Sequence, residues 1–158
     1  KDIDFFISLS GPEPQRSILE KRIIEQIDEL RGSIVMSLGK TEETDVPTNK
    51  NIQIYTYLSK EKREELLNRS KMVISRSGYS TIMDLATIGN KALMIPTPGQ
   101  IEQEYLAEHL KKSNICHTTT QDKLQLKTDT NLAQKTKGFP VKGNIEKTVE
   151  NVLDIILN

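Results

Sequence analysis

Short apolar runs alternate with segments of helical periodicity along almost the whole chain. The runs predict strands over residues 3–9, 33–38, 52–57, 72–75, 92–95 and 115–118. The segments between them predict helices over about residues 15–30, 59–70, 80–88 and 101–112, a polar loop over 39–51, and a last helix marked by Ile145, Val149, Val152, Leu153 and Ile156. Strands that alternate with helices pair in parallel through right-handed crossovers. The pattern therefore predicts an α/β fold, a doubly wound and mostly parallel Rossmann-like sheet with helices on both faces.

Composition narrows the class of protein. The 158 residues fit one domain, and 22 basic against 22 acidic side chains argue against a nucleic-acid binder. The single Cys116 excludes an internal disulfide and a cysteine-rich zinc site, so we expect a cytoplasmic location. No apolar run approaches the roughly 18 residues that a membrane-spanning helix requires. Because a strand-like run begins almost at Lys1, we expect residues 1–158 to be one domain of a longer protein.

Three loops follow predicted strands and lead into helices, over residues 10–16, 75–81 and 96–100. Doubly wound sheets bind their ligands at the carboxyl ends of the strands, where such loops meet. These three loops are therefore the first places to look for a binding site.

The loop over residues 75–81 carries the clearest chemistry. Gly78 allows a tight turn and close approach of a ligand to the backbone. Tyr79, Ser80 and Thr81 offer N–H groups and hydroxyls at a helix start, which favours an anion such as a diphosphate. Asp84, one turn further on, offers a carboxylate to a ribose diol. The structural alternative is that Thr81 and Asp84 form a capping box.

A longer combination of residues around this loop resembles one known family. The residues that carry the likeness are Ser75-Arg76-Ser77-Gly78, Thr81, Asp84-Leu85-Ala86, Gly89, Ile95-Pro96 and Gln103. In order and spacing they are similar to the C-terminal, donor-binding domain of family 28 glycosyltransferases. That family has the two-domain GT-B fold and contains the N-acetylglucosaminyltransferase of peptidoglycan-precursor synthesis. The strong likeness covers about residues 72–110.

The resemblance implies roles for individual residues near the loop over 75–81. The positions of Tyr79, Ser80 and Thr81, after Gly78, would hold the diphosphate of the donor. The position of Asp84 would bind the ribose hydroxyls. The family usually has Glu there, whereas Asp84 is one methylene shorter.

Further donor-binding positions follow from the same resemblance. Gln103 and the adjacent Glu104 would contact the donor sugar, and the backbone of Tyr57 and Leu58 would line a uracil pocket. Gly11 lies in the first loop, and Arg16 occupies an arginine position beside it. A second Gln is usual at the position of Glu104, and the stiffer residues 11–14 replace a Gly-Gly-Ser-like loop.

The function implied is transfer of a hexose or N-acetylhexosamine from a UDP-sugar to an unidentified acceptor. None of the three loops contains an Asp-x-Asp pair, so we expect no metal at the diphosphate and no other cofactor. His109 and His117 are more typical of packed residues than of a general base. We therefore expect the base in a missing N-terminal acceptor domain, an inactive isolated fragment, and peripheral association with the inner face of the membrane through the missing half.

Three alternatives remain open from the sequence. The chain could be half of a UDP-sugar epimerase, although that reaction needs further carboxylates and histidines. It could be a donor-binding subunit that works only with a separate membrane-bound partner. It could also be a non-enzymatic nucleotide-sugar sensor, which turnover by the full-length protein would exclude.

Overall fold

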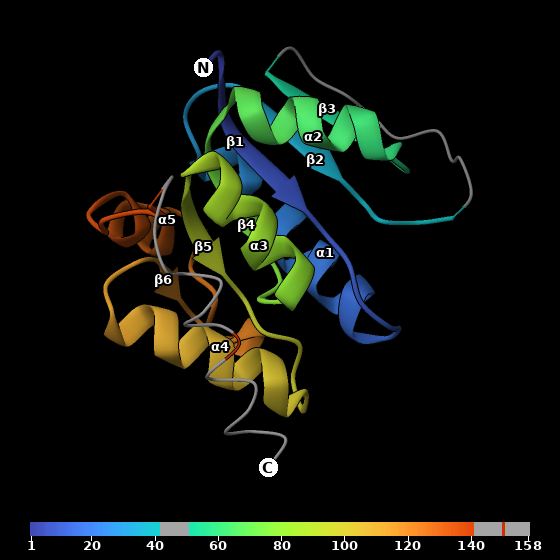
Figure 1. The fold of residues 1–158 in the computed structure, drawn as a ribbon. Helices are drawn as coiled ribbons and strands as arrows, with labels where there is room; N and C mark the ends of the chain where they lie inside the picture. Colours follow the sequence, from blue (N-terminus) through green and yellow to red (C-terminus); the bar gives the residue numbers. More distant parts are fainter. Residues whose placement is uncertain (42–50, 141–149, 151–158) are drawn as a thin grey trace.

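The fold is one parallel sheet of six strands. The computed structural model describes residues 1–41, 51–140 and 150 (Figure 1). The strands are β1 (Ile3–Ser8), β2 (Ile34–Ser37), β3 (Ile52–Tyr55), β4 (Ser70–Ser75), β5 (Lys91–Met94) and β6 (His117–Thr118), in the spatial order β3-β2-β1-β4-β5-β6. Every neighbouring pair is parallel. The predicted doubly wound α/β sheet is confirmed.

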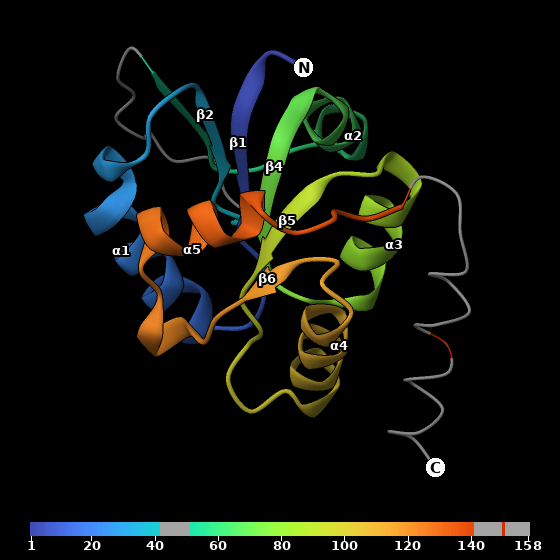
Figure 2. The ribbon, with the colours of Figure 1, turned by 90° about the vertical axis from the view of Figure 1, so that its left-hand side faces the viewer.

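Helices cover both faces of this sheet (Figure 2). The helical elements are α1 (Gln15–Gln26), the 3-10 turn η1 (Ile27–Glu29), α2 (Lys60–Arg69), α3 (Tyr79–Ile88), α4 (Ile101–Lys112), the 3-10 turn η2 (Gln121–Lys123) and α5 (Leu126–Gln134). One apolar cluster joins the sheet to α2, α3 and α4, and a second joins the opposite face to α1 and α5. Adjacent side chains of β1 show the division, since Phe6 and Ile7 belong to different clusters and neither is exposed. Burial on both faces explains why the strands are continuous apolar runs.

The sequence interpretation missed α5, which packs beside α1 on the second face. The helix contains two threonines and buries Asp129 and Thr130 beside Leu126 and Ala133, so only half of its buried side chains are apolar. The Asp129 carboxylate accepts the backbone N–H of Gln125 and contacts His117 Nε2 at 3.0 Å. Tertiary contacts of a polar side chain thus replace the apolar pattern that predicts most helices.

The other predicted elements are present with small changes in their bounds. Helix α4 has the predicted range, whereas β4 begins two residues early at Ser70 and β6 is shorter than predicted. Cys116 is buried in the apolar cluster that includes α2, α3 and α4, where it packs as a small hydrophobic side chain. The helix predicted from Ile145 to Ile156 lies outside the described residues, apart from residue 150, as does most of the loop over 39–51.

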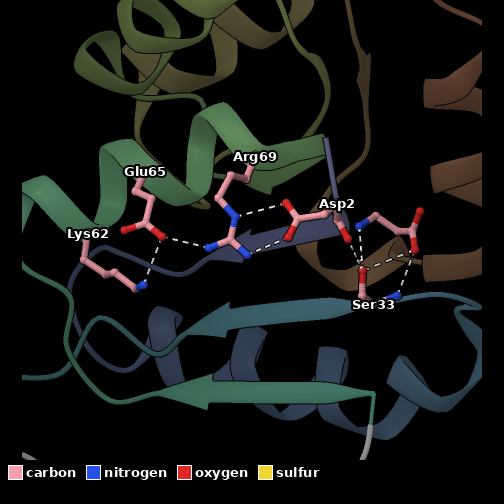
Figure 3. Close-up of polar contacts among 6 residues, drawn as sticks. Asp2, Ser33, Lys62, Glu65 and Arg69 are labelled. Atoms are coloured by element: carbon pink, nitrogen blue, oxygen red, sulfur yellow. Dashed lines mark hydrogen bonds and ion pairs between the residues drawn. The ribbon is translucent and has the colours of Figure 1, made fainter.

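An ion-pair network ties α2 to the start of the sheet (Figure 3). Arg69 contacts Asp2 and Glu65, both at 2.7 Å, and Lys62 contacts Glu65 at 3.2 Å. The hydrogen bond from Arg69 lowers the pKa of Asp2 to about 2. A depression of about 550 Å³ lies at this amino edge of the sheet. The charges around it already pair with one another, and the strands reach their carboxyl ends on the opposite side of the molecule.

Candidate functional site

The carboxyl ends of the strands lie level with one another. Ser8 at the end of β1 pairs with Ser37 of β2 and with Ser75 of β4, and Ser75 pairs with Met94 of β5. The sheet order reverses between β1 and β4, which creates the crevice in which open α/β sheets bind ligands. The three loops singled out in the sequence therefore meet at one edge. We name the loops after β1, β4 and β5 by their residues: 9–14, 76–78 and 95–100.

Gly78 is the N-cap of α3, at the end of loop 76–78. Its φ of −74° is available to any residue, so the backbone conformation does not need the freedom of glycine. A Cβ at this position would meet nothing within 4 Å. Neither backbone conformation nor packing within the described residues requires glycine, and its missing side chain leaves open space directly in front of the helix.

The first turn of α3 differs in charge from those of its neighbours. It has no side-chain cap and no acidic residue, and Ser80 is exposed there. The α4 start has Glu102 and Glu104, and at α1 the Glu13 carboxylate accepts the Ser17 N–H at 3.3 Å. The α3 start therefore keeps both its helix-terminal N–H groups and its positive potential available for an anion.

The capping-box alternative for Thr81 and Asp84 is wrong, because the helix begins at Tyr79 and Thr81 already lies inside it. Asp84 instead contacts Arg63 of α2, with Nη1 and Oδ2 2.7 Å apart. The Asp84 side chain remains 46% exposed. Its carboxylate is therefore held by one partner and open to a second.

Gln103 and Glu104 hold loop 95–100 in shape. The Gln103 side-chain oxygen accepts the Thr97 N–H at 2.8 Å, and Glu104 accepts the Gly99 N–H at 3.1 Å. The Gln103 amide nitrogen donates to Gln100. Both side chains lie at the predicted edge of the sheet, where they position the loop. Contact with a donor sugar remains a prediction for both.

Loop 9–14 is anchored by Arg16, which is 6% exposed. Its guanidinium contacts Glu13 and Glu20 at 2.7 and 2.8 Å and donates to the Leu38 carbonyl at 2.9 Å. Gly11 has a φ of +108°, a conformation that favours glycine. The donors of Arg16 are engaged inside the protein, so its geometry is that of a residue that shapes the loop.

The segment between β3 and α2 brings backbone groups to the same edge. Tyr57 is exposed, and Leu58 packs partly against the apolar cluster below it. Within the described residues the N–H and C=O of Leu58 take part in no backbone hydrogen bond. This peptide edge is open to a ligand, and a role in binding uracil remains a prediction.

Arg76 entered the sequence interpretation only as part of a motif, and the structure gives it a central position. It is 2% exposed and lies under the three loops. Its guanidinium donates to the carbonyls of Ile95, Pro96 and Gln15. It also donates to the side-chain oxygen of Gln121 at 2.7 Å. These partners were not predictable from the sequence, because they lie far apart along the chain.

Comparison with known proteins agrees with this geometry. The model of the "Glycosyltransferase family 28 C-terminal domain" matches residues 15–150. The chain belongs to this family. A UDP-N-acetylglucosamine--N-acetylmuramyl-(pentapeptide) pyrophosphoryl-undecaprenol N-acetylglucosamine transferase of Sulfurihydrogenibium sp. (strain YO3AOP1) is 25% identical over 154 residues. The alignment covers 89% of the chain and 44% of that protein. The transferase of the same name from Methylobacterium radiotolerans is 47% identical over 38 residues, which are 24% of the chain and 10% of that protein.

Solved structures share the family's fold. Acinetobacter baumannii MurG has a TM-score of 0.62 at 18% identity, over 98% of the chain and 50% of MurG. The spinosyn rhamnosyltransferase SpnG, complexed with thymidine diphosphate, has a TM-score of 0.64 at 16% identity, over 99% of the chain and 42% of SpnG. The solution structure of ALG13 has a TM-score of 0.63 at 12% identity, over 97% of the chain and 96% of ALG13. The fold is thus that of GT-B glycosyltransferases, and the chain spans about half the length of MurG.

Other chemical groups lie away from the α3 start. His109 is on the last turns of α4, and the ring of His117 is held by Asp129 of α5. Among residues 1–41, 51–140 and 150, no group of three or more His, Cys, Asp or Glu side chains is placed to hold a metal ion. No helix in this part of the chain has the length and apolar character to cross a bilayer.

Proposed function

We propose that the chain binds the nucleotide-sugar donor of a glycosyltransferase, a UDP-sugar carrying a hexose or N-acetylhexosamine. Membership of the glycosyltransferase family supports the reaction class. The α3 start supports the donor, because it is an uncapped helix N-terminus at the switch point of the sheet. That observation carries the proposal, because a diphosphate would accept hydrogen bonds from the free N–H groups of Tyr79, Ser80 and Thr81.

The nucleoside end of the donor has candidate partners on either side of α3. Asp84 has an exposed carboxylate that could accept the two ribose hydroxyls, and the Leu58 peptide offers one donor and one acceptor to uracil. Thymidine diphosphate in the SpnG structure supports the ligand class, because thymine and uracil share the same hydrogen-bonding edge. Helix dipole and backbone donors would stabilise the leaving diphosphate without a metal.

A second domain would supply the acceptor and the general base. The Sulfurihydrogenibium relative and MurG are both about twice as long as this chain. We propose that the chain is the C-terminal half of such an enzyme in the cytoplasm, attached to the inner face of the membrane through the other half. ALG13 favours a second arrangement, a donor-binding subunit with a separate partner, because its fold matches the chain over 96% of ALG13.

Nucleotide preference tests the proposed donor. We expect calorimetry to show that UDP binds and that GDP binds at least about fivefold more weakly, because the Leu58 peptide edge fits one pyrimidine ring. GDP carries the same diphosphate, so the ratio reports on the base alone. Equal binding of the two would contradict uracil recognition. Failure of both to bind at millimolar concentration would contradict donor binding.

A further inference from the structure

Arg76 is a buried cation without an anionic partner in the described part of the chain. All its hydrogen bonds go to neutral oxygens, namely three backbone carbonyls and the amide oxygen of Gln121. Burial lowers the pKa of Arg76 to about 10, a value at which it is still protonated at neutral pH. Burying a charge with no counter-charge is costly, and proteins normally pair such a group.

The unpaired charge lies at the switch point. Arg76 directly follows β4 and donates to Gln15 at the start of α1 and to the carbonyls of loop 95–100. A Cβ on Gly11 would lie 3.5 Å from Thr97 Oγ1 and 4.0 Å from Arg76 Nε. Both of these atoms are buried and have no hydrogen-bond partner among the residues that the structure describes. Unsatisfied polar atoms of two loops thus lie close together beneath Gly11. One of the two residues, Arg76, comes two positions before Gly78, the N-cap of α3.

Structural need explains only part of this arrangement. An amide or a lysine could bind single carbonyls, but only a guanidinium could reach all four oxygens at once. A carboxylate at position 121 would satisfy the same donor and cancel the charge, yet the chain has a neutral glutamine there. The geometry therefore leaves a net positive charge under the crevice.

We propose that Arg76 is the buried counter-charge for the diphosphate of the bound nucleotide. This inference rests on the proposed function and adds a positioning residue to it. Arg76 acts through the electrostatic field that it creates, whereas the α3 start makes the contacts with the diphosphate. In an interior of low polarity, a charge acts over several ångströms more strongly than it does in water. The negative charge that builds up on the leaving diphosphate would be stabilised in the same way.

Gln121→Glu tests the charge without removing Arg76. The new carboxylate would lie against Arg76 Nη2 with the same shape as the amide, and Gln15 can turn its own amide to keep a hydrogen bond to residue 121. We expect UDP to bind roughly tenfold more weakly or worse, and uridine to change by less than about twofold. Gln134→Glu is the matched control, since it makes the same chemical change on an exposed residue. Gln134 ends α5 and lies near Lys91 at the start of β5. This variant should leave the affinities for UDP and uridine unchanged.

A second pair of variants gives an independent measurement. Arg76→Lys keeps the charge and should retain UDP binding within about threefold, while Arg76→Gln keeps donors without the charge and should lose roughly tenfold. Equal losses for UDP and uridine in Gln121→Glu, or unchanged UDP binding, would overturn the inference and leave the proposed function intact. If the unaltered chain binds no UDP, both proposals fail.

Discussion

The chain on its own should bind UDP but transfer no sugar. The candidate diphosphate site lies within one chain, at the α3 start, so binding needs no second domain. Transfer also requires an acceptor held in line with the anomeric carbon and a base near its hydroxyl. His117 is tied to Asp129 and His109 is at the far end of α4, so neither reaches the crevice from the described structure. Loss of acceptor alignment alone costs on the order of 10⁵-fold in rate.

Turnover is measured as UDP released from a UDP-sugar with and without the proposed acceptor domain. We expect no release above the uncatalysed rate from the chain alone, and activity once an acceptor domain is supplied on the same chain or as a separate partner. Sugar transfer by the chain alone would show that it is not half of an enzyme.

Removing the Asp84 carboxylate should weaken UDP binding roughly tenfold or more, because a charged hydrogen bond is typically worth about 1.5–3 kcal/mol. The expected partners are the two ribose hydroxyls. Calorimetry on folded Asp84→Ala, with UDP as the ligand, measures the loss. A ligand that lacks both ribose hydroxyls, 2′,3′-dideoxyuridine diphosphate, should bind the variant and the unaltered chain equally.

Arg63 provides the control for this experiment. Asp84→Ala removes the ion pair to Arg63 together with the proposed ribose contact, whereas Arg63→Ala removes the ion pair alone. We expect Arg63→Ala to change UDP affinity less than about threefold, since an ion pair this exposed contributes about 0–1 kcal/mol. If the two variants lose equal affinity, the carboxylate acts by holding α2 and α3 together and not by binding ribose.

Much of the fold was predictable because its strands are buried on both faces and read as short apolar runs. Helix α4 has the predicted bounds, because Leu106, Ala107 and Leu110 recur with helical spacing and mark its buried side. Helix α5 shows where this reasoning fails. Its buried Asp129 is satisfied by His117 and by a backbone N–H, and such partners are visible only in three dimensions. A rule based on apolar spacing counts that aspartate as solvent-exposed.

The site was predictable in position more than in detail. The motif from Ser75 to Thr81 located the α3 start, but the glycine alone did not show that open space lies in front of the helix. Thr81 and Asp84 matched a capping box in spacing, yet the helix begins two residues earlier at Tyr79. The importance of Arg76 arises from Gln15 and Gln121, which the fold brings together from distant parts of the sequence.

The position of the diphosphate tests the central claim most directly. A crystal of the chain soaked with UDP should show phosphate oxygens within hydrogen-bonding distance of the N–H groups of Tyr79, Ser80 and Thr81, in the space in front of Gly78. The ribose should then lie beside Asp84. Phosphate density at the opposite edge of the sheet, beside Lys62 and Arg69, would contradict the account.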